Sequence, residues 1–146
     1  MKNTPRTRFT RKLDDFMKSP QRVGWLADRE FSVYIRKSVR KIDENACECL
    51  DLAAIEVAER AQGKGIFNMV VDVMKEAARK NGKSYILLEL VHNRPFREHI
   101  EQSPTWTAHP ELERCFYSPV HELTSTEQWI TQSKSNAAPA KEQVST

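Results

Sequence analysis

The chain has 146 residues, enough for one domain with one hydrophobic core, and its formal charge of +3 is too mild to argue for a nucleic-acid partner. No apolar run is long enough to cross a membrane, and we expect no secretory signal, because the first residues are polar. The three cysteines have no spacing to histidine that is typical of zinc sites. We therefore expect reduced thiols, no metal and a cytoplasmic location.

The first residues are basic and polar. Residues 1–12 are predicted to form a flexible basic arm, since such charge runs are usually solvated, and nucleic acid is not expected as a partner. The arm overlaps the segment Phe9 to Lys18, whose apolar spacing indicates a short helix that ends before Pro20. The domain itself is predicted to occupy residues 13–130.

Two long strands are predicted next. A brief segment, Val23 to Ala27, precedes a strand from Phe31 to Ile42 in which apolar residues alternate with others. The turn Asp43–Asn45 then leads into an antiparallel partner, Ala46 to Val57.

The stretch Leu50 to Arg79 combines a buried strand, a glycine-containing turn and an amphipathic helix. Gly63 and Gly65 lack Cβ atoms, so the backbone can adopt positive φ and approach a ligand closely. The helix that begins near Gly65 offers unpaired amides, and Lys64 adds a cation. These features predict a phosphate or pyrophosphate site. The alternative is an ordinary strand-to-helix turn with two glycines.

Spacing excludes two well-known phosphate loops. A Walker loop needs glycine at Ala58 and serine or threonine at Gly65. A dinucleotide fingerprint needs a third glycine at Asn68. The turn therefore belongs to another class of phosphate loop, if it binds phosphate.

The remaining elements complete an α/β pattern. The almost continuous apolar run from Ser84 to Val91 predicts a central strand, which the preceding helix joins by a right-handed crossover. Asn93 caps a further helix that Ser103 and Pro104 close, and Leu112–Tyr117 indicates a last strand. A final helical turn is expected around Trp129. Residues 133–146 are predicted to be a disordered tail.

The hexapeptide Arg60–Gly65, Arg-Ala-Gln-Gly-Lys-Gly, resembles the Arg/Gln-x-x-Gly-x-Gly/Ala loop of the GNAT superfamily of N-acetyltransferases. The order of strand, loop, helix, strand and asparagine extends this resemblance over Phe31 to Trp106. It implies a mixed sheet in one α/β domain, acetyl-CoA as co-substrate and an amine acceptor, such as a protein lysine, an N-terminus or a small amine. Two other readings stay open: a non-catalytic or CoA-binding interaction protein on this scaffold, and modification of a nucleic-acid amine.

The resemblance also implies how acetyl-CoA binds. Family members hold the pantetheine arm by backbone hydrogen bonds from the strand that ends here at Val57, beside which the next strand splays away to admit the thioester. Turn amides hold the pyrophosphate. The expected cofactor-binding residues are Val57, Arg60, Gln62, Gly63, Lys64, Gly65, Ile66 and Asn93.

Transfer to an amine needs a base that removes the amine's proton. Asp51 is the first candidate, because it interrupts an apolar strand and lies six residues before Val57, where histone-acetylating relatives place a catalytic glutamate. Burial would raise its pKa, which suits a base. The alternative for Asp51 is a carboxylate that faces water at a strand edge. Glu56, Glu59 and His92 are weaker candidates.

Two departures from the family pattern concern the acceptor and the leaving group. The family carries two helices between its first strands, whereas one short helix is predicted before Phe31, so we expect a reduced fold. The tyrosine that often protonates the leaving thiolate would fall at Ile100, which cannot serve. His99 points about 100° away around the helix and can equally be a surface histidine. Tyr117 is the other candidate acid, and a thiolate can also leave without one.

Overall fold

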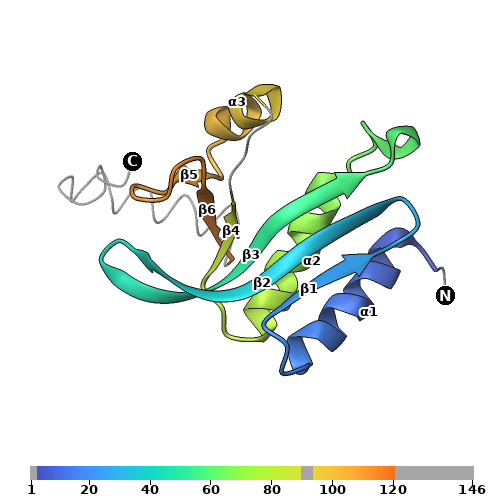
Figure 1. Cartoon of the computed structure of the whole chain (residues 1–146), viewed down its shortest axis with the longest axis horizontal. Coiled ribbons are helices and arrows are strands. Elements are labelled where there is room, and N and C mark those ends of the chain that lie inside the picture. The colour runs from blue at the N-terminus through green and yellow to red at the C-terminus, as the bar shows by residue number, and fades with distance from the viewer. Residues whose placement is uncertain (1–2, 90–93, 121–146) are drawn as a thin grey trace, which may run out of the picture.

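The computed structural model of the chain describes residues 3–89 and 94–120. It has a mixed α/β fold, with a six-stranded sheet in the order β1-β2-β3-β4-β6-β5 (Figure 1). Only β3 and β4 are parallel among the paired strands described. The elements in chain order are α1 (Pro5–Lys18), β1 (Val23–Ala27), β2 (Phe31–Ile42), β3 (Asn45–Val57), the 3-10 helix η1 (Glu59–Ala61), α2 (Ile66–Lys80), β4 (Tyr85–Leu88), α3 (Arg94–Gln102), β5 (Thr107–Ala108) and β6 (Phe116–Pro119).

The first helix, α1, begins at Pro5, four residues before the predicted start, and ends at Lys18 as expected. The Thr4 hydroxyl accepts a hydrogen bond from the Thr7 amide at 3.1 Å, and Pro5 supplies a φ angle suited to the first turn. Residues 5–12, which we expected to belong to a flexible arm, are therefore helical. The physical reason is that Phe9 is buried in the core, 1% exposed.

The core role of α1 gives a stability prediction. Phe9→Ala is expected to lower the free energy of unfolding by about 3–5 kcal/mol, because it removes a buried ring that packs edge-on against Phe31 at 5.5 Å. Urea unfolding followed by circular dichroism measures the change. Arg11→Ala, at an exposed position of the same helix, is the matched control and should be nearly neutral. Equal stability of the two variants would show that the N-terminal helix does not contribute to the core.

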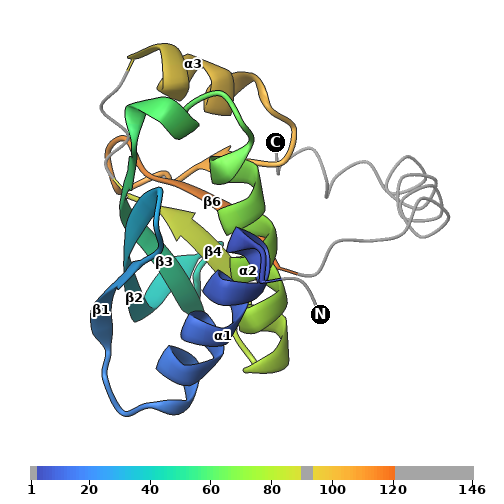
Figure 2. The same ribbon diagram turned by 90° about the vertical axis from the view of Figure 1, so that its right-hand side faces the viewer.

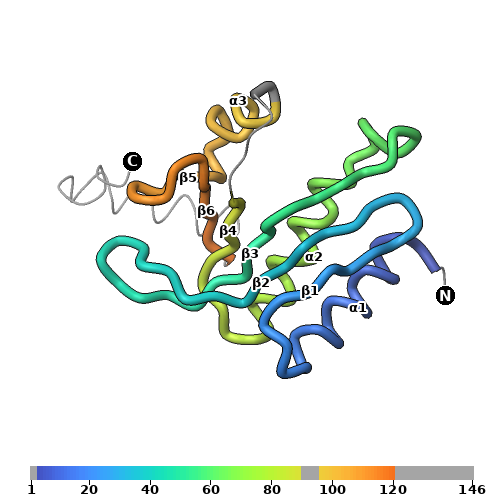
Figure 3. Tube along the Cα trace, viewed as in Figure 1, coloured from blue at the N-terminus to red at the C-terminus, as the bar shows by residue number. Residues whose placement is uncertain are grey.

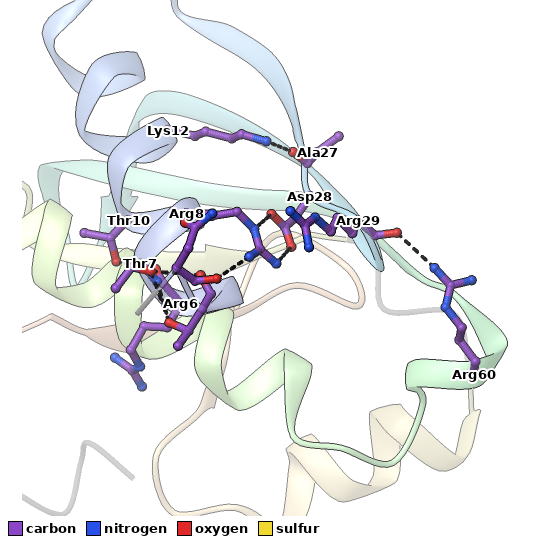
Figure 4. Close-up of polar contacts among 11 residues, drawn as sticks. Arg6, Thr7, Arg8, Thr10, Lys12, Ala27, Asp28, Arg29 and Arg60 are labelled. Carbon is purple, nitrogen blue, oxygen red and sulfur yellow. Dashed lines mark hydrogen bonds and ion pairs between the residues drawn. The ribbon is translucent and has the colours of Figure 1, made fainter. Parts of the chain in front are cut away.

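An ion pair ties α1 to the turn between β1 and β2. The Arg8 guanidinium donates to both carboxylate oxygens of Asp28, at 2.7 and 3.0 Å, and Lys12 donates to the Ala27 carbonyl (Figure 4). The hydrogen bond to Arg8 lowers the pKa of Asp28 against the opposing effect of burial. Two basic side chains of the expected arm thus have structural partners.

The helix α2 follows the predicted range and ends at a left-handed cap. Gly82 has a φ angle of 75°, and the Lys83 amide donates to the Ala78 carbonyl at 2.9 Å. Helices α1 and α2 lie side by side on one face of the sheet (Figure 2). The hydrophobic core lies between these two helices and the sheet. The other face carries no helix among residues 3–89 and 94–120, while α3 lies beyond the ends of β3 and β4 (Figure 2).

The long β2–β3 hairpin matches the prediction. Ile42 pairs with Asn45 across a two-residue turn in which Asp43 and Glu44 have positive φ angles, the geometry that suits the twist of a hairpin. The Cα trace shows this turn projecting away from the helices (Figure 3).

The last strand differs from its predicted range. Strand β6 covers Phe116–Pro119 instead of residues 112–117. The His109 ring accepts hydrogen bonds from the amides of Glu111 and Leu112 through Nδ1, at 3.1 and 3.2 Å, so the chain turns there before the strand begins. A short strand, β5, was not predicted and pairs with β6.

Several predictions lie outside the described residues. These are the cap at Asn93, the position of His92, the helical turn around Trp129 and the tail at 133–146. Within residues 3–89 and 94–120, no helix is both long and apolar enough to cross a membrane.

Candidate active site

The glycine turn has the backbone geometry that its sequence predicts. Gly63 and Gly65 have φ angles of 80° and 78°, in the left-handed region that favours glycine. A Cβ atom on either residue would have no heavy atom within 4 Å, so space is open above the backbone. Helix α2 begins at Ile66, and the first amides of a helix have no intrahelical acceptor. The turn therefore presents positive dipole ends to an open space.

Two side chains of the turn form hydrogen bonds with neighbouring parts of the chain. Gln62 Nε2 donates to the Val57 carbonyl at 3.2 Å and closes the turn against the end of β3. The Arg60 guanidinium donates to the Arg29 carbonyl at 3.3 Å (Figure 4). It also pairs with Glu30 at 3.5 Å. Arg60 thus points to the β1–β2 turn, and the main chain is what remains for a ligand.

A cavity of about 280 Å³ adjoins the turn. It is formed by the end of β3, the glycine turn, the first turn of α2 and one side of α3. Five of the predicted cofactor-binding residues line it, whereas Arg60 and Lys64 do not, and Asn93 lies outside the described residues. The lining residues are Val57, Ala61, Gln62, Gly63, Gly65, Ile66, Phe67, Asn68, Phe96 and His99.

Among the described residues, the pairing of β3 with β4 ends beside this cavity. Their parallel pairing covers Cys49–Leu52 and Tyr85–Leu88, and the last hydrogen bond runs from the Glu89 amide to the Leu52 carbonyl at 3.2 Å. Beyond it, β3 continues to Val57. The register between β2 and β3 shifts at this point, because Ala53 is an extra residue in β3. Such a bulge bends a strand and increases its twist, which opens β3 away from β4.

A cluster of charged side chains lies on the helix-free face where the two strands part. Asp51, whose side chain is completely buried, accepts hydrogen bonds from Ser38 Oγ at 2.7 Å and from Arg40 Nη2 at 2.8 Å. The same Arg40 nitrogen donates to Glu89 at 2.7 Å, and Arg36 also pairs with Glu89. When Asp51 is protonated, it shares a hydrogen bond with Glu89. Glu89 remains 12% exposed, so it is the carboxylate that a substrate can reach.

The environment separates the proton affinities of the two carboxylates. Burial and the hydrogen bond with Glu89 raise the pKa of Asp51 to about 6. The pKa of Glu89 is lowered, because the hydrogen bonds from Asp51 and Arg36 outweigh the opposing effect of its own burial. The pair therefore takes up its first proton on Asp51 as the pH falls. A nearby thiol is not a competing nucleophile, since burial and Asp51 raise the pKa of Cys49 to about 12.

The two predicted acids lie in different places. Tyr117 is on β6 in the same sheet row as Leu87 and Asp51, about 10 Å from Asp51 across two strand spacings. Its ring packs edge-on against Tyr85 at 5.4 Å, and burial raises its pKa. His99 is exposed on α3 and lines the cavity beside the turn. The structure brings neither residue into contact with the carboxylate pair.

The charged cluster contains four residues that the sequence analysis did not single out. They are Arg36, Ser38 and Arg40 on β2, and Glu89 just after β4. Two signals were present in the sequence: a single acid inside the apolar run 84–91, and three polar residues at every second position of a strand. Both patterns place polar side chains on one face of a sheet. Neither pattern reveals that β2 and β4 lie on either side of β3, which brings these side chains together around Asp51 on one face.

The site has no arrangement typical of a bound metal. No group of three or more histidine, cysteine, aspartate or glutamate residues could hold an ion in the part of the chain that the structure describes.

The described turn and cavity fit an acyl-CoA. Its pyrophosphate needs closely spaced main-chain donors and an open approach, which the amides of residues 63–66 and the absent Cβ atoms at Gly63 and Gly65 supply. Its extended pantetheine arm needs an unpaired strand edge, and among residues 3–89 and 94–120 no strand pairs with this edge of β3 after Leu52.

No protein-family model and no curated protein matches the sequence. Solved structures with a similar fold do exist, and three of them illustrate the likeness. A chain of the KacTA–DNA complex has a TM-score of 0.52 and 15% identity, over 84% of this chain and 86% of that chain. AtaT complexed with acetyl-methionyl-tRNAfMet has a TM-score of 0.50 and 13% identity, over 77% of each chain.

A mutant AtaT toxin bound to the C-terminus of the antitoxin AtaR and acetyl-CoA gives a TM-score of 0.49 and 14% identity, over 62% of this chain. This chain spans 59% of that protein's length. Identities this low concern the fold and not the activity. Together with the mixed six-stranded sheet and the strand–turn–helix at its centre, the likeness to the first two structures shows that the chain has a GNAT-like α/β fold.

Proposed function

We propose that the protein is an N-acyltransferase that moves an acetyl group from acetyl-CoA to a primary amine. The observation that carries the proposal is the left-handed Gly63–Gly65 turn at the start of α2, placed beside the point where β3 and β4 diverge. A phosphate site and an open strand edge lie next to each other there, as an acyl-CoA requires. The GNAT-like fold supports the proposal.

The main chain supplies most of the binding. The amides of residues 63–66 hold the pyrophosphate, and the edge of β3 between Ala53 and Val57, which pairs with no described strand on this side, hydrogen-bonds the pantetheine amides. These donors and acceptors are fixed by the fold, so little conformational entropy is lost on binding. Lys64, which is exposed beside the turn, adds a long-range attraction for the phosphates.

The carboxylate pair supplies the base. Glu89 lies where the described pairing of β3 and β4 ends. It accepts the proton that the acceptor ammonium loses before its nitrogen attacks, and Asp51, with the higher pKa, holds this proton. As the amine nitrogen bonds to the thioester carbon, the carbon–sulfur bond breaks and the thiolate leaves. The bonded nitrogen loses its second proton, which neutralises the thiolate, and the first proton passes from the pair to solvent. Asp51 thus acts as the proton acceptor that its sequence position suggests. The proton reaches it through Glu89 and not directly from the amine.

Two measurements test the function. Isothermal titration calorimetry should show one acetyl-CoA bound per chain, and candidate amines should then release free thiol from acetyl-CoA, detected with a thiol-reactive dye. If the correctly folded protein does not bind acetyl-CoA, the whole proposal is wrong.

The second candidate is a protein that binds CoA without transferring an acyl group. One observation favours it: the position where the family places its acid is Ile100, whose side chain is buried in the core. The same two measurements separate the candidates. Tight binding of acetyl-CoA with no thiol release for any amine would favour the binding protein.

The acceptor is to be sought among several amines. AtaT is found with acetyl-methionyl-tRNAfMet, and KacTA is found with DNA. These complexes weaken our expectation that nucleic acid is not a partner, although the likeness concerns the fold alone. Labelled acetyl-CoA can be added to a lysate together with the protein, and the label then counted separately in the protein and RNA fractions. This experiment distinguishes a protein lysine or N-terminus, a small amine and an amine carried by nucleic acid as the acceptor.

A further inference from the structure

An exposed apolar patch lies at β1, the edge strand of the sheet (Figure 1). Three large apolar side chains are strongly exposed in the described part of the chain, and two of them belong to β1: Val23 is 41% exposed and Trp25 is 53% exposed. Single exposed apolar residues need no explanation, but neighbouring ones that form a patch mark an interaction surface.

The strand register places this patch on the helix-free face, next to the charged cluster of the candidate active site. Val23 pairs with Arg36, a member of that cluster. Trp25 pairs with Tyr34, which is half-buried. Paired residues of neighbouring strands point to the same face of the sheet. Gly24 points to the other face, because a Cβ atom there would meet a side chain of α1 at 3.2 Å.

A series of contacts leads from the patch to Glu89, the proposed base. The Trp25 and Tyr34 rings pack with their centroids 5.2 Å apart. The Arg36 guanidinium lies 5.9 Å from the centroid of the Tyr34 ring and also pairs with Glu89. With the usual spacings within a sheet, these contacts place the Trp25 ring about 10–15 Å from the Glu89 carboxylate. An extended polypeptide spans that distance with about three or four residues.

We propose that Val23, Trp25 and Tyr34 bind the polypeptide that carries the acceptor amine, and that they select a large apolar side chain, above all an aromatic one, a few residues from that amine. The inference rests on the proposed function and deepens it, because it names the acceptor class. With the amine at Glu89, the next residues of the acceptor cross Arg36 and set the apolar side chain against the two rings. This contact removes the exposed indole from water and adds a stacking or edge-on contact between rings.

The surroundings of the patch favour a polypeptide over a small amine or a nucleic acid. Trp25 stands on open surface, whereas small ligands are bound mostly in concave pockets. Tryptophan, tyrosine and arginine are also the residue types that contribute most to protein–protein binding. Nucleic acid needs cations for its phosphates, but Arg36 is already paired with Glu89. Glu56, which is exposed on the same face, adds negative charge.

Acetyl transfer to two synthetic peptides tests the inference. One peptide is Lys-Ser-Ser-Phe-Ser-Ser, and the other has serine in place of the phenylalanine. Lysine at the first position offers both an α-amine and an ε-amine. The full-length protein should act on the phenylalanine peptide with a kcat/KM about tenfold higher, the usual scale for burying most of an aromatic ring. Thiol release from acetyl-CoA measures both rates.

Trp25→Ala should reduce that ratio to near one. Its rate with the serine peptide and its affinity for acetyl-CoA should stay at the wild-type values, because the proposed acyl-CoA site and base do not include Trp25. A purely structural effect would lower both rates equally and leave the ratio at about ten, which would reject the inference. Val39→Ala is the matched control: Val39 is 59% exposed on the β2–β3 hairpin, outside the patch, and this variant should keep the wild-type ratio.

Equal kcat/KM values of the wild-type protein for the two peptides, or transfer to small amines and to neither peptide, would overturn the inference and leave the proposed function intact. Absence of acetyl-CoA binding would overturn both. An RNA oligonucleotide that inhibits the wild-type protein but not Trp25→Ala would give the patch to nucleic acid and reject the inference. A dimer in analytical ultracentrifugation that Trp25→Ala dissociates would give it to a second copy, with the same consequence. The comparison of peptides on the wild-type protein needs no variant, so it decides the matter even if Trp25→Ala does not fold.

Discussion

Replacing Glu89 by glutamine is expected to lower the turnover rate for acetyl transfer by about 10²- to 10⁴-fold, the usual range for general acid–base catalysis. Glutamine keeps the shape of the side chain and can still accept from Arg36 and Arg40, but it cannot take up the proton of the amine. The affinity for acetyl-CoA should change little, because the residues proposed to hold acetyl-CoA lie at the turn and along β3. Steady-state thiol release and calorimetry measure the two effects.

Asp51→Asn should lower the turnover rate by a similar factor and also change its pH dependence. A base acts when it is deprotonated, so the wild-type rate should rise as the pH increases through the pKa of Asp51, about 6, and level off above it. That rise should disappear in Asp51→Asn, since the asparagine does not titrate. A pH–rate profile from pH 5 to pH 8 measures this difference between the two proteins.

Glu56→Gln is the matched control for both changes. Glu56 is an exposed glutamate on the same strand as Asp51, and its replacement should leave the rate and its pH dependence unchanged. If Glu56→Gln loses turnover while Glu89→Gln and Asp51→Asn keep it, the carboxylate pair is structural and the base lies nearer the turn.

Valine at Gly63 or Gly65 is expected to abolish measurable binding of acetyl-CoA. Both positions have positive φ angles, which a β-branched residue adopts only with strain, and the new side chain would occupy the open space in which the pyrophosphate approaches the amides. Because a Cβ atom at either position would have no heavy atom within 4 Å, the loss should come from the blocked approach and the altered backbone and not from a clash inside the core. Calorimetry measures the affinity.

Gly82→Val separates strain from ligand blocking. Gly82 has nearly the same φ angle, 75°, but lies at the opposite end of α2. The three variants should lose similar amounts of stability, seen as similar decreases of Tm, while only the first two lose acetyl-CoA. Binding that survives in folded Gly63→Val and Gly65→Val would reject the phosphate site at the turn.

The sequence by itself determined the parts of the site that depend on local backbone chemistry. Two glycines after a buried strand and before an amphipathic helix predicted positive φ angles and a helix N-terminus open to an anion, and the structure confirms that geometry. The antiparallel hairpin and the parallel central strand followed in the same way from alternating and continuous apolar patterns. The turn and the hairpin are local, because each depends on residues close together in the chain, and the parallel strand was predicted from the crossover through the intervening helix.

Only the tertiary structure decided which distant side chains meet. Arg40 joins Asp51 to Glu89 across three strands, although the two acids are 38 positions apart in the sequence, and strand order and register are what place them together. Packing against α2 and the sheet likewise orders the basic N-terminal segment as a helix, because burial of Phe9 outweighs the tendency of charged residues to remain solvated. Side-chain pairing also turned Arg60 toward Glu30 and away from the cavity. Such outcomes depend on the competition among partners in space, which the order of residues along the chain does not contain.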